Sequence, residues 1–304
     1  MKKQIKIWYN IYGDKKVKEQ FYEIEKNLPF NLKHIFECGQ CFRWNTIDNN
    51  TYIGVIGNNV LEVKEENNKI KFCGMCEEDI KELVNRYFDL DTDYEKIKTK
   101  LSNIDDYLKT SIEFGSGIRI LKQDLWETLI SFIISANNNI PRIKGIIERI
   151  SKKYGKKIVY KNKEYYTFPT AEELSKASVE DLRKLGLGFR DKRIYETTKL
   201  IKKGRIDLYG LEKIKDTNKI REILLTIPGV GPKVADCILL FGFNRFEVFP
   251  IDVWVRRVMN ELYIKNEDET KVKKEEIELL AKTKYASLAG IAQQYLFYWK
   301  RETA

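Results

Sequence analysis

A lysine stands near the start of a predicted helix, where acidic side chains are favoured. Residues 225–237 read Leu-Thr-Ile-Pro-Gly-Val-Gly-Pro-Lys-Val-Ala-Asp-Cys, an apolar segment, a turn and the start of a helix at or near Pro232. Gly229 and Gly231 permit positive φ and close backbone approach, and the free N–H groups of the second helix suit a phosphate. Lys233 is then either a solvated lysine that contacts phosphate or a reactive amine. The second interpretation is possible because the positive end of the helix lowers the pKa of a nearby amine and so favours its neutral, nucleophilic form.

Two nearby residues could share that chemistry. Cys237 lies four positions after Lys233, on the same helix face, although a buried apolar role fits its type equally well. Asp252 follows a Pro-Ile pair and is predicted to cap the next helix. Its carboxylate could also stabilise positive charge that develops beside the lysine in a transition state.

Two polar segments could contact nucleic acid. Asn137-Asn138-Asn139 follows a buried helix predicted over 125–135, with Arg142 just beyond. These amides either simply end the helix or donate hydrogen bonds into a groove of a nucleic acid. Phe189-Arg190 follows Gly188 as a second, exposed aromatic–basic pair. Together with a phosphate-binding turn, they suggest a DNA surface with an apolar wedge and basic fingers.

Length and charge narrow the class of protein. The chain has 304 residues, enough for two domains, and a net charge of +10. That charge favours a polyanionic partner, although well-solvated lysines alone would also produce it. No apolar run approaches a membrane span, and residues 1–7 start no signal peptide, so we expect a cytoplasmic protein (nucleoid-associated in a prokaryote) with reduced thiols.

The five cysteines give a weak metal signal. Cys38/Cys41 and Cys73/Cys76 form two Cys-x-x-Cys pairs, but the gap between pairs is long and both lie in strand-like sequence. No metal site is predicted. The single histidine, His34, excludes His-rich metal chemistry and a Ser-His-Asp triad near the turn.

The pattern of elements divides the chain near residue 105. Residues 1–105 are predicted to be β-rich, because short β-branched and aromatic segments (41–46, 51–56, 60–64 and 69–73) alternate with Asn- and Gly-containing turns. A helix is expected over 77–88. Residues 106–304 read as helical almost to the end, including 271–282 and 289–301. Helix caps are predicted at Asp124 (with a reciprocal Glu127), Thr170 and Ser178.

These motifs, in this order, resemble the helix-hairpin-helix DNA glycosylases, and within them the 8-oxoguanine DNA glycosylase/lyases. The resemblance covers nearly the whole chain. It implies an α+β fold: an antiparallel, TBP-like β domain (1–105) that contributes to lesion recognition, then a mainly helical HhH-GPD catalytic domain (106–304, hairpin near 222–243). The motifs are Gly39-Gln40-Cys41-Phe42-Arg43-Trp44, 137–142, 186–190, 229–237, 250–253 and 293–297.

The resemblance also implies roles for single residues. Lys233 would attack the sugar C1′ of a flipped nucleotide, form a Schiff base and nick the strand by β-elimination, while Asp252 would stabilise the oxocarbenium-like sugar. Four residues would bind the base: Cys237 and Phe297 on its faces, Gln293 at its Watson–Crick edge, and the Gly39 carbonyl at N7–H, which guanine lacks. The remaining DNA contacts would be Asn137, Arg142 and Arg190 at the orphaned cytosine, Phe189 as wedge, and the amides of Gly229, Gly231 and Val234 at phosphate.

The expected partner is double-stranded DNA with an oxidised purine, bound by a monomer, without a membrane. No cofactor is expected, apart from a structural monovalent or calcium ion at the hairpin when DNA is bound. Two positions depart from the family: Trp254 replaces a histidine typical of eukaryotic members, and Cys41 replaces a serine. The cysteine cluster of the endonuclease III relatives is absent after Asp252.

Three alternatives remain at this stage. A glycosylase for alkylated bases shares the scaffold but generally relies on the aspartate alone, so Lys233 disfavours it. A non-catalytic helix-hairpin-helix DNA-binding module would need neither Asp252 nor Gln293. A basic membrane-surface protein would need an amphipathic segment that we do not find.

Overall fold

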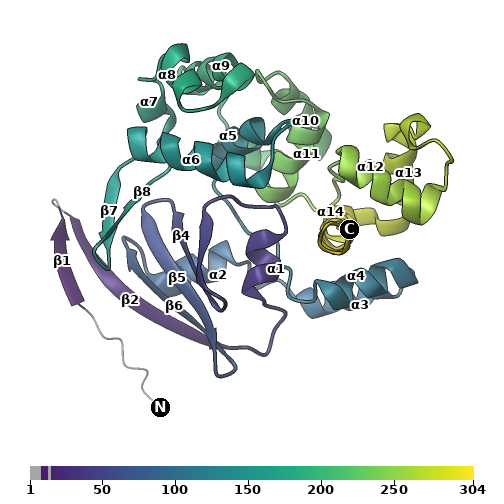
Figure 1. Cartoon of the computed structure of the whole chain (residues 1–304), viewed down its shortest axis with the longest axis horizontal. Helices are drawn as coiled ribbons and strands as arrows, with labels where there is room; N and C mark the ends of the chain where they lie inside the picture. Colours follow the sequence, from purple (N-terminus) through teal and green to yellow (C-terminus); the bar gives the residue numbers. More distant parts are fainter. Residues whose placement is uncertain (1–7, 13–14) are drawn as a thin grey trace.

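The computed structural model describes residues 8–12 and 15–304 (Figure 1). Residues 1–7, where the sequence predicts no signal peptide, lie outside this part. The N-terminal region is an antiparallel sheet in the order β1-β2-β6-β5-β4-β3. Its strands are Trp8–Tyr12 (β1), Lys15–Glu25 (β2), Trp44–Asp48 (β3), Thr51–Ile56 (β4), Asn59–Glu66 (β5) and Lys69–Cys76 (β6).

Turn chemistry predicted the last four strands correctly. Asn67 and Asn68, between β5 and β6, both have positive φ (53° and 56°), the geometry of a tight hairpin turn. β3 begins three residues later than expected, at Trp44. β1 and β2 were not predicted, because β2 is rich in charged residues and carries little hydrophobic signal.

Both faces of the sheet are covered. On one face pack α1 (Leu32–Glu37) and α2 (Ile80–Tyr87), around an aromatic cluster in which Phe36 stacks on Trp44 with ring centres 4.0 Å apart. On the other face, Val60 and Met75 contact Tyr160 of a distant hairpin. The sheet is therefore held between its own helices and a segment of the helical region.

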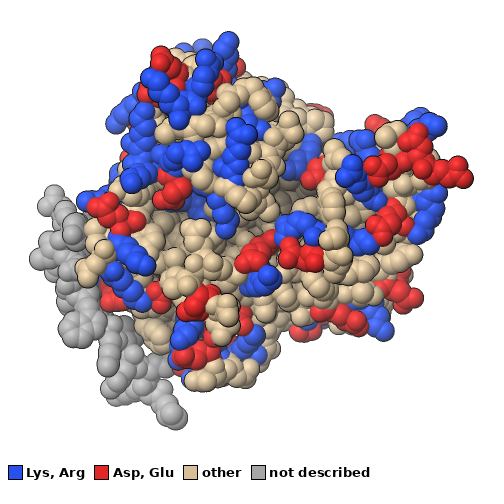
Figure 2. All heavy atoms as spheres, in the orientation of Figure 1, with Lys and Arg blue, Asp and Glu red and all other residues tan. Residues whose placement is uncertain are grey.

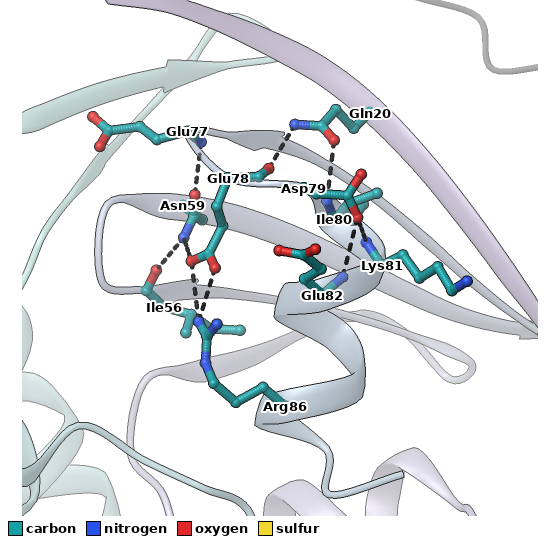
Figure 3. Close-up of polar contacts among 10 residues, drawn as sticks. All are labelled: Gln20, Ile56, Asn59, Glu77, Glu78, Asp79, Ile80, Lys81, Glu82 and Arg86. Carbon is teal, nitrogen blue, oxygen red and sulfur yellow. Dashed lines mark hydrogen bonds and ion pairs between the residues drawn. The ribbon is translucent and has the colours of Figure 1, made fainter. Parts of the chain in front are cut away.

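Helix α2 is attached to the sheet at its first turn (Figure 3). Asp79 caps the helix through its carboxylate. Gln20 of β2 accepts a hydrogen bond from the Ile80 N–H (3.0 Å) and donates one to the Glu78 carbonyl (2.8 Å). The predicted helix over 77–88 is confirmed, but the cap at Asp79 delays its start.

The rest of the chain is mainly helical, as predicted. Thr170 and Ser178 form the expected capping boxes, and the helix from Leu125 to Ser135 has the predicted bounds. Across the described ranges, no helix combines the length and apolar character needed to cross a membrane. The helices are α3 (Tyr94–Ser102), α4 (Asp106–Phe114), α5 (Leu125–Ser135), α6 (Ile140–Tyr154), α7 (Ala171–Leu174), α8 (Val179–Lys184), α9 (Asp191–Lys202), α10 (Thr217–Leu225), α11 (Pro232–Phe241), α12 (Val253–Met259), α13 (Lys274–Tyr285) and α14 (Ala289–Thr303).

One hairpin interrupts the helical region, where the sequence analysis expected none. β7 (Lys157–Tyr160) and β8 (Lys163–Tyr166) pair around Lys161-Asn162, two residues with positive φ. Tyr160 is 3% exposed and its hydroxyl donates to Cys73 Sγ at 3.4 Å. Burial against the outer face of the sheet therefore stabilises strands that are too short to hold alone.

Two helices before residue 115 join the helical core. Tyr94 and Leu101 of α3 and Leu108 of α4 belong to the same buried cluster as α5 and α11. Arg119, 1% exposed, links this part to the sheet region by donating to the Phe88 and Pro29 carbonyls at 3.0 and 3.2 Å. The two regions thus share buried contacts as well as a chain connection.

Candidate active site

The predicted helix–turn–helix is formed by α10 and α11. Gly229 has φ +88°, and a Cβ there would lie 3.0 Å from Ile133 Cγ2 and 3.1 Å from Arg193 Cβ. Only glycine fits such a turn without displacement. The expectation of positive φ at Gly231 is wrong: its φ is −97°, and nothing lies within 4 Å of where a Cβ would be. Gly231 therefore leaves an open approach to the helix end.

The N-terminus of α11 presents free backbone donors. Pro232 opens the helix, as predicted, and no side chain caps it. The first N–H groups of a helix have no intrahelical partners, so those of Lys233 and Val234 are available to an anion. The turn fits a phosphate, and Lys233 lies within the same helical turn.

Lys233 and Asp252 line one cavity of about 720 Å³. The Lys233 ammonium lies 5.5 Å from the centre of the Phe132 ring. Asp252 caps α12 as predicted, and its Oδ1 accepts from the Val255 N–H at 2.8 Å. Cap geometry uses one carboxylate oxygen, so the group can still act on charge that develops in the cavity.

Cys237 lies beside this pair. Its side chain is 3% exposed, and burial raises the pKa of the thiol to about 11, while the nearby Lys233 opposes the rise through its charge and a hydrogen bond. A buried neutral thiol is a poor nucleophile. Cys237 therefore lies behind Lys233 as a buried neutral thiol, and the amine is the candidate nucleophile of the site.

The predicted base-binding residues of the N-terminal region and of α14 meet on one side of the molecule. Gly39 has φ +87°, and a Cβ there would lie 3.4 Å from both Phe297 Cε1 and Arg301 Nη1. Gln293 is 4% exposed and its side-chain oxygen accepts from Gln294 Nε2 at 2.7 Å. Gln293, Phe297 and Arg301 are spaced four residues apart and therefore share one face of α14.

Two aromatic rings connect this group to the lysine. Phe42, three residues after Gly39, makes an edge contact with Phe132 of α5 at 5.5 Å between ring centres. Phe132 in turn faces the Lys233 ammonium. Phe132 therefore links the Gly39–Trp44 segment to Lys233 of the hairpin, a contact that sequence spacing alone did not indicate.

Asn137, Arg142 and Phe189 are placed where DNA could reach them. Asn137 lines the lysine cavity and has φ +51°, while Arg142 is exposed at the start of α6. Phe189 is 55% exposed, with the Arg193 guanidinium 5.4 Å from its ring centre. These positions are consistent with an apolar wedge beside a polar loop.

Arg190 is not an exposed finger, contrary to the sequence-based prediction. It is 2% exposed, and its guanidinium donates to the carbonyls of Ala136, Asn137 (2.7 Å) and Leu187 (3.3 Å). Desolvation and the charges of Arg142 and Arg193 lower its pKa. In this structure Arg190 holds the 136–137 loop in place.

Removal of Arg190 should therefore destabilise the fold. Arg190→Ala leaves buried carbonyls without donors, so we expect a loss of about 2–3 kcal/mol in the free energy of unfolding. Arg142→Ala, which removes an exposed guanidinium, should cost about 0.5 kcal/mol or less. Denaturant unfolding of both variants checks this, and equal stabilities would show that the carbonyls find other partners.

Other residues of the site were missed by sequence reasoning. Arg193 and Arg257 line the cavity, and Phe132 lies beside the Lys233 ammonium. None of the three belongs to a local motif, and only the fold brings them to the site. Trp254, noted as a departure from the family, lines the same cavity, and its indole Nε1 is buried without a hydrogen-bond partner.

Glu127 does not form the predicted reciprocal cap. Asp124 caps α5 by accepting from the Glu127 N–H at 2.8 Å, but the Glu127 carboxylate turns toward Arg43, 3.9 Å away. Burial raises the pKa of Glu127 to about 7, and the Arg43 charge opposes the rise. The acid therefore joins the Gly39–Trp44 segment to α5.

This buried acid gives a pH signature. The folded pKa lies above the ordinary value of 4.5, so the contribution of Glu127 to stability is present below pH 4.5 and is lost as pH rises through about 7. We expect the loss to be about 2 kcal/mol, because the side chain keeps 21% of its exposure. Glu127→Gln should lack this loss. Unfolding at pH 4.5 and 7.5 measures it, with the surface variant Glu180→Gln as control, and parallel profiles for wild type and Glu127→Gln would contradict it.

The Cys-x-x-Cys pairs do not converge. All five cysteines are free, and Cys38 belongs to the helical core whereas Cys41 and Cys76 belong to the sheet core. Among the described residues, no group of three or more His, Cys, Asp or Glu side chains could hold a metal ion. Burial raises the pKa of the Cys38 thiol to about 11.

A second cavity, of about 640 Å³, lies between the sheet and the start of α5. Its two basic side chains are both held in ion pairs: Arg86 with Glu78 at 2.9 Å (Figure 3) and Lys122 with Asp89 at 2.7 Å. No unpaired nucleophile lines it, so the chemistry is better placed at Lys233.

Basic side chains gather on one part of the surface. Figure 2 shows Lys and Arg predominating over α6–α9, whereas acidic and basic residues mix around α13. Exposed basic residues of α6–α9 are Arg142, Arg149, Lys152, Lys153, Arg183, Lys184, Lys192, Arg193, Lys199 and Lys202, and Lys203 and Arg205 follow just after α9. This asymmetry is typical of a surface that follows a phosphate backbone.

Comparisons with known proteins agree with this geometry. Residues 23–129 match the 8-oxoguanine DNA glycosylase N-terminal domain, and residues 130–283 match the HhH-GPD superfamily base excision DNA repair protein family. The N-glycosylase/DNA lyase of Saccharomyces cerevisiae is 32% identical over 88% of this chain and 82% of its own length. A probable N-glycosylase/DNA lyase of Methanothermobacter thermautotrophicus is 32% identical over 80% of this chain and 83% of its own.

A solved structure matches almost the entire chain. It is the Clostridium acetobutylicum 8-oxoguanine glycosylase/lyase in complex with double-stranded DNA containing cytosine opposite 8-oxoguanine. It is 41% identical, covers 99% of this chain and 98% of its own, and has a TM-score of 0.86.

Proposed function

The chain belongs to the HhH-GPD superfamily of base excision DNA repair proteins, in the branch with the 8-oxoguanine glycosylase N-terminal domain, and we propose that it does this branch's chemistry. It is a DNA N-glycosylase with lyase activity that removes 8-oxoguanine from duplex DNA. The observation that carries the proposal is the pairing of Lys233 and Asp252 in one cavity beside a phosphate-binding turn.

Lys233 supplies the nucleophile. Its neutral amine attacks C1′ of the flipped nucleotide, the N-glycosidic bond breaks, and the base leaves with the electron pair and takes up a proton. The sugar opens to a Schiff base with the lysine. β-Elimination then breaks the C3′–O bond, which nicks the strand 3′ to the lesion, and water hydrolyses the imine. Asp252 stabilises the oxocarbenium-like sugar during the first step.

The base is recognised between the Gly39 segment and α14. Phe297 and Cys237 contact its two faces, and Gln293 bonds to its Watson–Crick edge. The Gly39 carbonyl accepts from N7–H of 8-oxoguanine. Guanine would place its own N7 lone pair against that carbonyl, so a buried acceptor would lack a partner and guanine would be rejected.

The opposite strand is held from the other side. Asn137 and Arg142 bond to the orphaned cytosine, and Phe189 enters the stack. Arg190 does not contact the cytosine itself; its guanidinium holds the 136–137 loop that presents Asn137. Amides of Gly229, Gly231 and Val234 bind phosphate.

The hairpin would bind a structural monovalent or calcium ion when DNA is present. Backbone carbonyls of residues 226–230 are oxygen donors of the type that a monovalent or calcium ion prefers. Two of them already accept hydrogen bonds: Pro228 from Thr197 Oγ1 at 2.8 Å and Ile227 from the Val230 N–H at 3.0 Å. Each carbonyl oxygen has a second lone pair that an ion could use. Such an ion would tie the turn to phosphate, and no chemical step depends on it. All residues used belong to one chain, so we expect a monomer.

An excision assay over matched duplexes tests the function. We expect 8-oxoguanine opposite cytosine to be cut at least about tenfold faster than 8-oxoguanine opposite adenine, and 3-methyladenine to be released poorly. Arg142→Ala should reduce that preference. Release of the alkylated base at equal rates would favour the alkylated-base alternative, and DNA binding without any excision would favour a non-catalytic module.

A further inference from the structure

Gln40, the residue after Gly39, is fully buried and uses its whole side-chain amide in hydrogen bonds. Its Nε2 donates to the Ile35 carbonyl at 2.9 Å and to the Arg119 carbonyl at 2.8 Å. Its Oε1 accepts from the Leu121 N–H at 2.8 Å. One side chain therefore joins α1 to the segment that connects the two regions.

The main chain of Gln40 is fixed as well. Its carbonyl accepts from Gln123 Nε2 at 2.8 Å. The Gly39 carbonyl belongs to the peptide plane that joins Gly39 to Gln40, so an anchored Gln40 sets the direction of that carbonyl. On its other side, Gly39 lies against Phe297 and Arg301.

The segment that anchors Gln40 is itself held by buried hydrogen bonds. Arg119 donates to the carbonyls of Phe88 (3.0 Å), Pro29 (3.2 Å) and Thr92 (3.2 Å). The Ile120 N–H donates to the Tyr94 hydroxyl at 2.9 Å. Such fully satisfied buried networks hold one arrangement, because any shift leaves several polar groups unpaired.

We propose that Gln40, with Gln123, is a positioning residue for specificity: it aims the Gly39 carbonyl at N7–H of the oxidised purine. This inference rests on the proposed function. A carbonyl that turns freely could move away from the guanine N7 and lose the penalty by which guanine is rejected. The two glutamines therefore affect base discrimination and leave the Lys233 chemistry on an abasic sugar unchanged.

The variants are Gln40→Ala and the milder Gln123→Ala, which keeps the Gln40 side chain in place. Gln20→Ala is the matched control, because Gln20 also bridges backbone groups in the N-terminal region (Ile80 N–H and Glu78 carbonyl) but lies in β2, away from Gly39. Borohydride trapping on abasic-site DNA reports the lysine chemistry without base recognition. Affinity for 8-oxoguanine:cytosine and guanine:cytosine duplexes, measured in a Lys233→Gln background, reports discrimination.

We expect Gln40→Ala and Gln123→Ala to lower the 8-oxoguanine/guanine affinity ratio by roughly tenfold while abasic-site trapping stays near wild type. Gln20→Ala should keep both. An unchanged ratio in Gln123→Ala, or a loss of trapping in parallel with discrimination, would overturn the inference, even if Gln40→Ala does not fold. A wild-type protein that neither excises 8-oxoguanine nor traps on abasic DNA would instead overturn the proposed function.

Discussion

Lys233→Gln should abolish the borohydride-trapped complex with DNA that contains 8-oxoguanine opposite cytosine, and should slow excision by more than about 10³-fold. Borohydride reduces the imine between amine and C1′, and an amide cannot form that imine. Glutamine is one bond shorter than lysine but keeps the methylene groups that could pack beside Phe132. Gel analysis of the adduct and single-turnover excision measure the two effects.

Lys274→Gln is the matched control for Lys233→Gln. Lys274 is also a lysine in the first turn of a helix, α13, where it pairs with Glu278 at 2.7 Å, and it does not line the Lys233 cavity. Its replacement should leave adduct formation unchanged. Lesion binding by Lys233→Gln should persist, because the hairpin amides and the base contacts remain. A normal adduct from Lys233→Gln would remove Lys233 from the role of nucleophile.

Local chemistry made the hairpin predictable. A Pro-Gly-Val-Gly turn, a proline at the helix start and an aspartate after Pro-Ile are each decided within a few residues, so the start of α11 and the cap at Asp252 were predicted correctly. The Asn- and Gly-containing turns likewise made the positions of β3–β6 predictable. These elements follow from backbone preferences that any tertiary context keeps.

Tertiary packing decided what sequence could not. β7 and β8 are short, and they form because Tyr160 finds the outer face of a sheet assembled from residues about a hundred positions earlier. β-branched and aromatic residues flank Lys161-Asn162 and are typical of a hairpin, but the surrounding helical pattern led to a prediction of helix there. β2 is rich in charged residues, and only its pairing with β1 and β6 reveals it as a strand.

The same limit applies to the site. Arg190 beside Phe189 looks like an exposed pair in sequence, but three backbone carbonyls of the fold bury its guanidinium. Phe132 looks like ordinary core of α5, and only the arrangement of α5 beside α11 places it between Phe42 and Lys233. Residue types indicated the chemistry, whereas the partners of each residue depended on contacts far apart in the chain.

Asp252→Asn should separate the two roles of this residue. Asparagine caps a helix about as well as aspartate, so the free energy of unfolding should change by about 0.5 kcal/mol or less. Excision should nevertheless fall by roughly 10²- to 10³-fold, because the amide carries no charge to stabilise the oxocarbenium-like sugar. Denaturant unfolding and single-turnover excision on the same preparation measure both.

Asp216→Asn is the matched control for Asp252→Asn, since Asp216 caps α10 by accepting from the Asn218 N–H at 2.9 Å and does not line the cavity. It should retain both stability and excision. If Asp252→Asn excises within about tenfold of wild type, charge at this position contributes little to the transition state and Asp252 acts as a cap alone. A large loss in Asp252→Asn with unchanged stability can arise only from the missing charge, because cap, volume and hydrogen bond to Val255 are all retained.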